Sequence, residues 1–134
     1  MKKRNYTAVA LAALVLLAGG VAQAESFEEA GGTTSTNTES IAIGTEAKAG
    51  ATSSTEYKET SSVALGKKSD ATAKQSVAIG ESAKAGQYSV ALGLRATTVA
   101  MSAAAVGADA TVTSGWGSAF GYNATVGGWE SVVG

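Results

Sequence analysis

The chain contains SVAIGESAKAGQY at residues 76–88, and SVALGLRATTVAMS follows directly at residues 89–102. Both stretches open with a pentad of the form Ser-Val-Ala-(Ile/Leu)-Gly and place an alanine three residues after its glycine, at Ala83 and Ala96. Because the whole pattern begins again at Ser89, the two stretches are interpreted as two copies of one structural unit.

The same unit recurs from residue 40 to the last residue. The residue numbers of successive closing glycines differ by 22, 14, 13, 14, 14 and 13, so five of the six intervals agree to within one position. Such regular spacing indicates a repeat protein built from stacked units. The glycines expected at the repeat turns are Gly44, Gly66, Gly80, Gly93, Gly107, Gly121 and Gly134.

Each unit has a hydrophobic period of two. Val77 and Ile79 alternate with Ser76 and Ala78, and a second short alternation of small residues follows the glycine. Period 2 is typical of strands, whereas a helix would place Val77 and Ile79 about 200° apart around its axis. Two strands in a unit of roughly 14 residues leave only tight turns, where glycine adopts conformations that a Cβ resists. We therefore predict an all-β parallel solenoid over residues 40–134, with essentially no helix.

The two faces of the longer strand differ in side-chain size. If Ser76 and Ala78 line a narrow interior, Val77 and Ile79 form an outer apolar stripe, which predicts an oligomer interface. If the bulky residues point inward, the monomer is better filled and the case for an oligomer weakens. The chain has no Cys, so repetition and oligomerisation are the expected sources of stability.

Residues 1–24 have the order of parts of a secretory signal peptide. Basic residues at positions 2–4 precede an unbroken apolar run over residues 8–18, and Ala22 and Ala24 form a small-x-small cleavage site. A membrane-spanning helix needs about 20 apolar residues, so the run is too short to serve as one. The sequence predicts an exported chain, cleaved after Ala24, with no membrane-spanning segment.

Two segments of the mature chain depart from the period. Residues 25–39 carry no repeat and are expected to form an irregular leader. The interval between Gly44 and Gly66 equals one coil plus about eight residues, and the polar stretch within residues 51–60 is the expected insertion.

Composition excludes several classes of function. Loss of residues 1–24 leaves 7 basic against 11 acidic residues, a net charge of −4 with no basic cluster, so nucleic acid is not an expected partner. The chain lacks His and Cys, and its acidic residues are scattered at turns, as at Asp70, Glu81 and Asp109. We expect no enzyme, no cofactor and no metal site. An ice-binding face is not expected either, because threonines do not share one coil position; those considered are Thr72, Thr98, Thr111, Thr113 and Thr125.

The repeated pentads followed by Ala-x-Ala, behind a signal peptide, resemble the YadA-like head of trimeric autotransporter adhesins. The resemblance covers roughly residues 40–134. It implies a left-handed parallel β-roll that assembles as a homotrimer. It also implies display at the bacterial surface, in the cell outer membrane, where such heads act in adhesion and virulence by binding host matrix, cells or abiotic surfaces.

The chain departs from the family at its end, because family members continue into a neck, a coiled-coil stalk and a membrane anchor. We expect a truncated or partial product of a longer adhesin, located at the cell surface within a full-length adhesin and otherwise periplasmic or secreted. The alternatives are a structural spacer segment or a non-functional fragment.

A second departure lies five residues before each repeat glycine, where many family heads carry Asn in the form NSVAIG, which is associated with collagen binding. The absence of Asn here argues against collagen as the ligand. Three of these positions are aromatic and are expected to align along one edge, as a ligand platform or as packing at a protomer seam; we favour the seam. Phe120, within a pentad, is expected in the core. The seven positions are Glu39, Ser61, Gln75, Tyr88, Ser102, Trp116 and Trp129.

Overall fold

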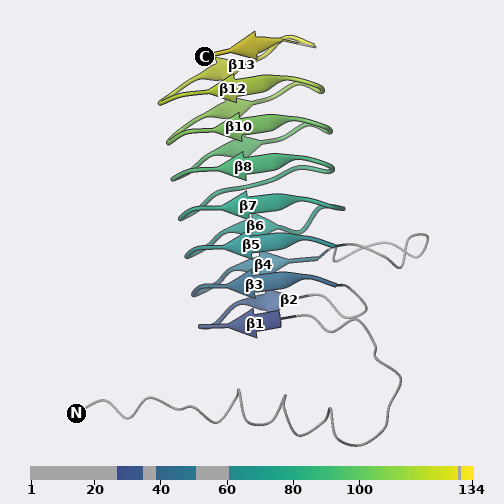
Figure 1. The fold of residues 1–134 in the computed structure, drawn as a ribbon, viewed down its shortest axis with the longest axis vertical. Coiled ribbons are helices and arrows are strands. Elements are labelled where there is room, and N and C mark those ends of the chain that lie inside the picture. The colour runs from purple at the N-terminus through teal and green to yellow at the C-terminus, as the bar shows by residue number, and fades with distance from the viewer. Residues whose placement is uncertain (1–26, 35–38, 51–60, 130) are drawn as a thin grey trace, which may run out of the picture.

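The fold is taken from a computed structural model, which describes residues 27–34, 39–50, 61–129 and 131–134. Within these ranges every regular element is a β-strand, and the strands stack into one elongated solenoid (Figure 1). The predicted all-β parallel solenoid is therefore confirmed for the described part of residues 40–134. The predicted signal peptide and the predicted insertion at 51–60 lie outside the described residues.

The longer strands come from the pentads and form one parallel sheet of eight strands, ordered β1-β3-β5-β7-β8-β10-β12-β14. Each strand pairs with its copy in the next coil, as Val77 pairs with Val90. The strands are β1 (Phe27–Glu29), β3 (Ile41–Ile43), β5 (Val63–Leu65), β7 (Val77–Ile79), β8 (Val90–Leu92), β10 (Ala104–Val106), β12 (Ser118–Phe120) and β14 (Val132–Val133).

The shorter strands lie on the opposite side of each coil, in two parallel sheets of three strands. Lys84 forms isolated bridges with Asp70 and Thr97, so it joins the two sheets into one continuous face. The strands are β2 (Thr33–Thr34), β4 (Lys48–Ala49), β6 (Asp70–Ala71), β9 (Thr97–Thr98), β11 (Thr111–Val112) and β13 (Thr125–Val126).

The wide interval between Gly44 and Gly66 is still a single coil. Strand β3 pairs directly with β5, and β4 pairs directly with β6. The additional residues of this coil therefore fall between β4 and β5.

Small side chains fill the interior between the two sheets. The middle residue of each longer strand from β3 to β12 is an alanine with 0% exposure, and small residues after the turn pack against it. The bulky residues of the same strands point outward. Of the two arrangements that the sequence left open, the structure has the one with small residues inside. The central alanines are Ala42, Ala64, Ala78, Ala91, Ala105 and Ala119.

The pentad serines form a buried ladder at the turn before each longer strand. The Ser62 amide donates to the Ser40 hydroxyl at 3.2 Å, and the Ala103 amide donates to the Ser89 hydroxyl at 2.9 Å. In the upper coils Gly117 takes the serine position. An added Cβ there would lie 2.8 Å from a methyl group of Val112 and of Val126. The larger valines occupy the room that the missing side chain leaves.

The turn after each longer strand needs glycine for two reasons. Gly80 has a φ of +132°, and an added Cβ would lie 2.3 Å from the carbonyl oxygen of Gly93 in the next coil. Stacked coils therefore approach one another through bare backbone at this turn. The same turn is formed with φ between 121° and 138° at Gly44, Gly66, Gly80, Gly93, Gly107 and Gly121.

The structure differs from the sequence prediction at the N-terminal end. Residues 27–34 are not an irregular leader, because β1 pairs with β3 and β2 pairs with β4, which makes one further coil. Parallel pairing uses backbone groups and does not need the pentad pattern, and Gly31 forms the turn with a φ of +81°.

The last coil is shifted by one position from the predicted alignment. Strand β12 pairs with β14 through Ser118 with Val132 and Ala119 with Val133, whereas the glycine spacing had placed residue 118 opposite residue 131. Gly134 therefore lies opposite Phe120 and is not a repeat-turn glycine. The prediction aligned the last coil by the spacing of its glycines. The backbone hydrogen bonds instead pair its strand one position further along the chain.

Candidate functional site: an apolar outer face and an aromatic edge

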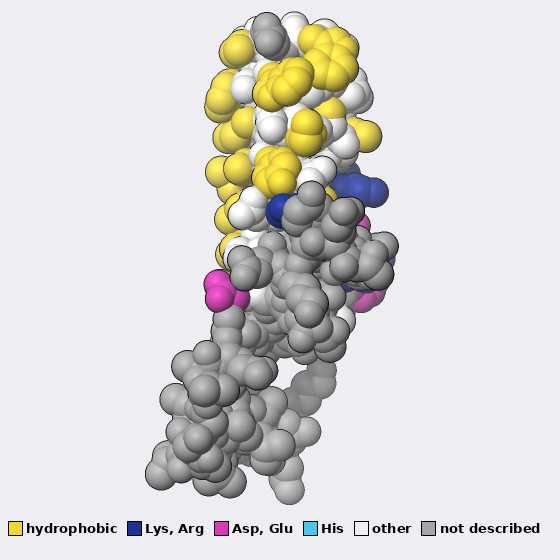
Figure 2. Space-filling model, turned by 90° about the vertical axis from the view of Figure 1, so that its right-hand side faces the viewer, with side chains coloured by type: hydrophobic (Ala, Val, Ile, Leu, Met, Phe, Trp, Pro, Cys, Tyr) yellow, Lys and Arg dark blue, Asp and Glu magenta, His cyan; other side chains and the backbone are white. Residues whose placement is uncertain are grey.

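The first candidate surface, the outer face, consists of the outward side chains of β3, β5, β7, β8, β10 and β12. Every one of these strands places at least one bulky apolar residue there. The most exposed of these side chains keep 39–45% of their surface accessible, as Leu92 does at 41%. Phe120 belongs to this face at 45% exposure, which corrects its predicted place in the core. The residue occupies the outward position of Leu92 and Val106 in the register. Figure 2 shows the face in profile as a column of hydrophobic side chains along the left margin.

The second candidate surface, the aromatic edge, is the turn before each longer strand, and Figure 2 faces it. Tyr88 and Trp116 occupy the same coil position, with φ values of +54° and +53° and exposures of 41% and 52%. A bulky residue in the left-handed region is uncommon and strained, and such strain often accompanies functional sites.

Trp129 reaches this edge from a different coil position. The register of the last coil aligns Trp129 with Gly115 and Met101, not with Trp116. Its ring nevertheless contacts Trp116, with centroids 5.4 Å apart and planes tilted by 49°. The two rings make a favourable tilted pair. The three predicted aromatics therefore share the edge, but not a single coil position.

Tyr88 stands apart from the tryptophan pair. Two coils separate it from Trp116, and Ser102 holds the position between them. The Lys74 ammonium nitrogen lies 5.6 Å from the centre of the Tyr88 ring, within the range of a cation–π contact.

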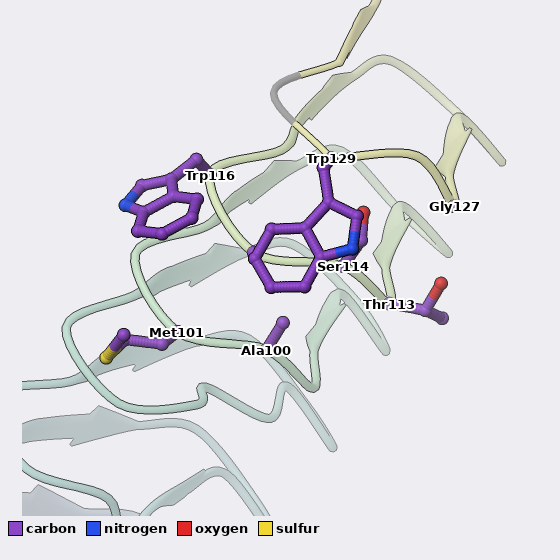
Figure 3. Close-up of a pocket in the computed structure, with 8 residues that line it drawn as sticks. Ala100, Met101, Thr113, Ser114, Trp116, Gly127 and Trp129 are labelled. Carbon is purple, nitrogen blue, oxygen red and sulfur yellow. The ribbon is translucent and has the colours of Figure 1, made fainter.

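A groove of about 360 Å³ lies between the aromatic edge and the shorter strands (Figure 3). Its walls are the rings of Trp116 and Trp129 and the Met101 side chain, and its floor is made of small residues. Trp129 lies over Gly115, where an added Cβ would come within 3.0 Å of the ring carbon Cζ3. All lining residues are uncharged: Ala100, Met101, Thr113, Ser114, Gly115, Trp116, Gly127 and Trp129.

Sequence reasoning missed most of this groove. Of its lining residues, only Trp116 and Trp129 were identified as candidates for a ligand edge, because only they fall five residues before a predicted repeat glycine. An alignment of the last coil that set Val132 opposite Ser118 would have placed Trp129 level with Gly115 and indicated the groove.

A protein-family model described as YadA head domain repeat (2 copies) matches residues 35–55, 59–83 and 85–110, which is more than half of the chain. The chain belongs to this family. No curated protein matches the sequence at a significant level. Membership in the YadA head family and the observed solenoid together confirm the resemblance found in the repeats.

The fifth position before the glycine adopts a left-handed backbone conformation in four coils. Asn is enriched several-fold among non-glycine residues with positive φ. This YadA head instead places Gln75, Tyr88, Ser102 and Trp116 in that conformation. The departure from Asn is thus a departure from the residue that suits the backbone best.

The opposite edge, at the turn after each longer strand, carries charged pairs between consecutive coils. Arg95 and Asp109 form a bidentate pair, with Nε to Oδ1 at 2.6 Å and Nη2 to Oδ2 at 2.7 Å. The hydrogen bonds that Arg95 donates to Asp109 have two effects. They hold the pKa of the Asp109 carboxyl below its ordinary value, and they raise the pKa of the Arg95 guanidinium. Weaker pairs join Lys67 with Glu81 and Lys68 with Glu46; the charged atoms of the second pair are 4.0 Å apart.

The YadA head family and the solenoid fold suggest a binding protein and not an enzyme. Among the residues that the structure describes, no group of three or more His, Cys, Asp or Glu side chains is placed to hold a metal ion. The same part of the chain contains no helix that is long and apolar enough to cross a membrane.

One column of threonines lies on the shorter strands. Thr97, Thr111 and Thr125 share one coil position and stack in register. Of the five threonines considered, only Thr111 and Thr125 belong to this column, because Thr98 pairs with Val112 one position further along. The column ends at Lys84, which pairs with Thr97, so the hydroxyl groups do not extend along the face.

Proposed function

We propose that the chain is the head of a homotrimeric bacterial surface adhesin that attaches the cell to host matrix, other cells or abiotic surfaces. Membership in the YadA head family supports an adhesin head region. The observation that carries the proposal is the outer face, an apolar stripe that continues from coil to coil on the long sheet.

The outer face has the properties of a subunit interface. It is contiguous and apolar, and monomeric proteins rarely expose large patches of this kind. Its apolar character is repeated at each rung, as in Ile41, Val63, Val77 and Val90, so a parallel copy can pack against it along the whole length. Three chains that share these faces would cover them.

A monomer has few other means of burying large side chains. Among the residues that the structure describes, the interior contains alanines, serines and Thr98, with Val112 and Val126 the largest fully buried hydrophobic residues. Burying a Val, Leu or Ile side chain contributes about 1.5–3 kcal/mol. The residues that could contribute this amount lie outside the coil, where only a partner can bury them.

Export and location are inferred from the sequence and the family. The predicted signal peptide at residues 1–24 supports passage to the cell exterior, and the family supports display at the cell surface. Small exported domains are often stabilised by disulfides, and this sequence has no Cys. Assembly with other chains would supply the stability that disulfides do not.

The test uses the mature chain, residues 25–134, joined to a trimeric coiled coil after Gly134. Immobilised on beads, the trimer is expected to bind epithelial cells or one of the matrix proteins fibronectin, laminin and collagen. The coiled coil alone on beads is the control. Equal retention of both kinds of bead on every surface would contradict an adhesin head and leave a structural spacer.

A further inference from the structure

We propose that the groove beside the paired rings of Trp116 and Trp129 binds a neutral glycan, with a sugar ring stacked on an indole. This inference rests on the proposed adhesin function and names the chemical class of the ligand at one edge of the head.

The shape of the groove suits a small ring ligand. Its volume of about 360 Å³ lies within the range of about 300–1,000 Å³ that small-molecule sites occupy. The hollow exists because Ala100, Gly115 and Gly127 supply a floor with almost no side-chain atoms. Figure 3 shows the two indoles on neighbouring turns of the solenoid, with the Trp129 ring extending from the last coil toward Ala100.

The groove is largely formed before any ligand arrives. The Trp129 ring rests on Gly115, and its contact with Trp116 restricts both indoles. Ser114 donates to the Gly128 carbonyl, which ties the floor to the loop that carries Trp129. Ligand binding to such a preformed site loses less conformational entropy.

The chemistry of the lining favours sugars without charge. The C–H faces of a pyranose stack on an aromatic ring, and the sugar hydroxyls need neighbouring hydrogen-bonding groups. Trp116 and Trp129 are 52% and 70% exposed. Thr113 is an exposed residue whose hydroxyl donates to the Val126 carbonyl, which leaves its oxygen able to accept from a sugar hydroxyl. None of the lining residues is charged, so the groove offers no cation to pair with a sialylated or sulfated ligand.

The local extent of the aromatic edge separates this site from a subunit interface. An interface along the whole solenoid requires apolar residues in every coil, as the outer face has. On the aromatic edge, the position of Trp116 is instead filled by Ser61, Gln75 and Ser102 in other coils. The tryptophan pair is confined to the upper coils and is therefore assigned to a ligand.

The experiment compares Trp116→Asn with Tyr88→Asn in the trimerised mature chain. Both changes replace an exposed aromatic residue at the same coil position with Asn, which suits the left-handed backbone there. Only the first removes a wall of the groove. Each protein is applied to a glycan array holding neutral, sialylated and sulfated oligosaccharides, and its mass and thermal midpoint are recorded.

We expect the unmodified head to bind at least one neutral glycan. Trp116→Asn should weaken that binding about tenfold or more, a loss of about 1.4 kcal/mol, while Tyr88→Asn should leave it unchanged. In solution the same neutral glycan should shift the tryptophan emission to shorter wavelength, because Trp116 and Trp129 are the two tryptophans of the chain.

Four results would overturn the proposal. Binding only to charged glycans would assign the groove to another ligand class. Binding of a collagen-like triple-helical peptide that is lost in Trp116→Asn would do the same. A lowered thermal midpoint of Trp116→Asn, with no neutral glycan bound, would assign the edge to a seam. Absence of glycan binding while the beads still adhere to cells would refute the glycan site and leave the adhesin function standing.

Discussion

Trp129 covers the backbone of Gly115, and its Cζ3 atom lies 3.0 Å from the place that a Cβ of residue 115 would take. The contact joins two consecutive coils and sets the position of the exposed indole beside Trp116. The absence of a side chain at residue 115 therefore decides where the second tryptophan lies.

Replacing Gly115 with Ala is expected to displace the Trp129 ring and change the tryptophan emission. The unfolding free energy should stay within about 1 kcal/mol of that of the unmodified chain, because the φ of Gly115 lies outside the left-handed region and the ring is exposed. Gly127→Ala is the matched control, since its nearest neighbour would be the Thr113 hydroxyl at 3.8 Å. Identical spectra for the two variants would show that Gly115 does not position Trp129.

The turn glycines predict a difference between two otherwise equal substitutions. Gly80→Ala and Gly121→Ala both force alanine into the left-handed region, which costs on the order of 1–3 kcal/mol. At Gly80 the Cβ would also lie 2.3 Å from the Gly93 carbonyl oxygen, whereas at Gly121 nothing lies within 4 Å. To relieve this contact, the two coils must separate and lose backbone hydrogen bonds between their strands. Urea unfolding should therefore show Gly80→Ala to be the more destabilising by about 2 kcal/mol or more. If both variants lose the same amount of unfolding free energy, the close approach of the coils does not explain the need for glycine at Gly80.

Restoring the pentad serine at residue 117 is expected to destabilise the protein. Gly117→Ser matches the residue found at Ser62, Ser76 and Ser89, yet its Cβ would meet methyl groups of Val112 and Val126 at 2.8 Å. Overpacking of this kind costs about 1–3 kcal/mol. In a chain that already carries Val112→Ala and Val126→Ala, Gly117→Ser should cost less than in the unmodified chain, which thermal unfolding can measure. A neutral or stabilising Gly117→Ser would refute the size compensation between these positions.

The pair of Arg95 and Asp109 predicts a contribution to stability that depends on pH. The pKa of Asp109 is lowered in the folded state by its hydrogen bond from Arg95, so the contribution is present above the ordinary Asp value of 3.8 and is lost as pH falls through the lowered folded value. Between pH 5 and pH 2 the thermal midpoint should therefore fall further for the unmodified chain than for Asp109→Asn. Parallel curves would show that the pair does not couple protonation to folding.

The sequence predicted those parts of the structure that depend on repetition. The pentads around Gly80 and Gly93 indicated the strands, the turns and the parallel stacking, because each coil repeats the same alternation and the same tight turn. Prediction failed where pairing is carried by backbone alone. Residues 27–34 form a coil without the pentad pattern, and the last coil shifts Trp129 by one position relative to the glycine spacing.

Side-chain size decided the remaining differences. The sequence could not say whether Val77 or Ala78 faces inward, because both arrangements preserve the alternation; the narrow space between the two sheets admits only the alanine. The same constraint moves Phe120 from the predicted core to the outer face. The groove near Trp116 depends on small residues in neighbouring coils, which no single repeat reveals.

The central claim is that the outer face of the long sheet holds three chains together. The most direct measurement is the thermal midpoint of residues 25–134 with and without a trimeric coiled coil fused after Gly134, for the unmodified chain, Leu92→Asp on the outer face and Thr111→Asp on the opposite sheet. We predict that the fusion yields a three-chain mass and raises the midpoint of the unmodified chain and of Thr111→Asp, but not of Leu92→Asp. An unfused chain that unfolds cooperatively as a soluble monomer, with a midpoint that neither the fusion nor Leu92→Asp changes, would contradict the claim.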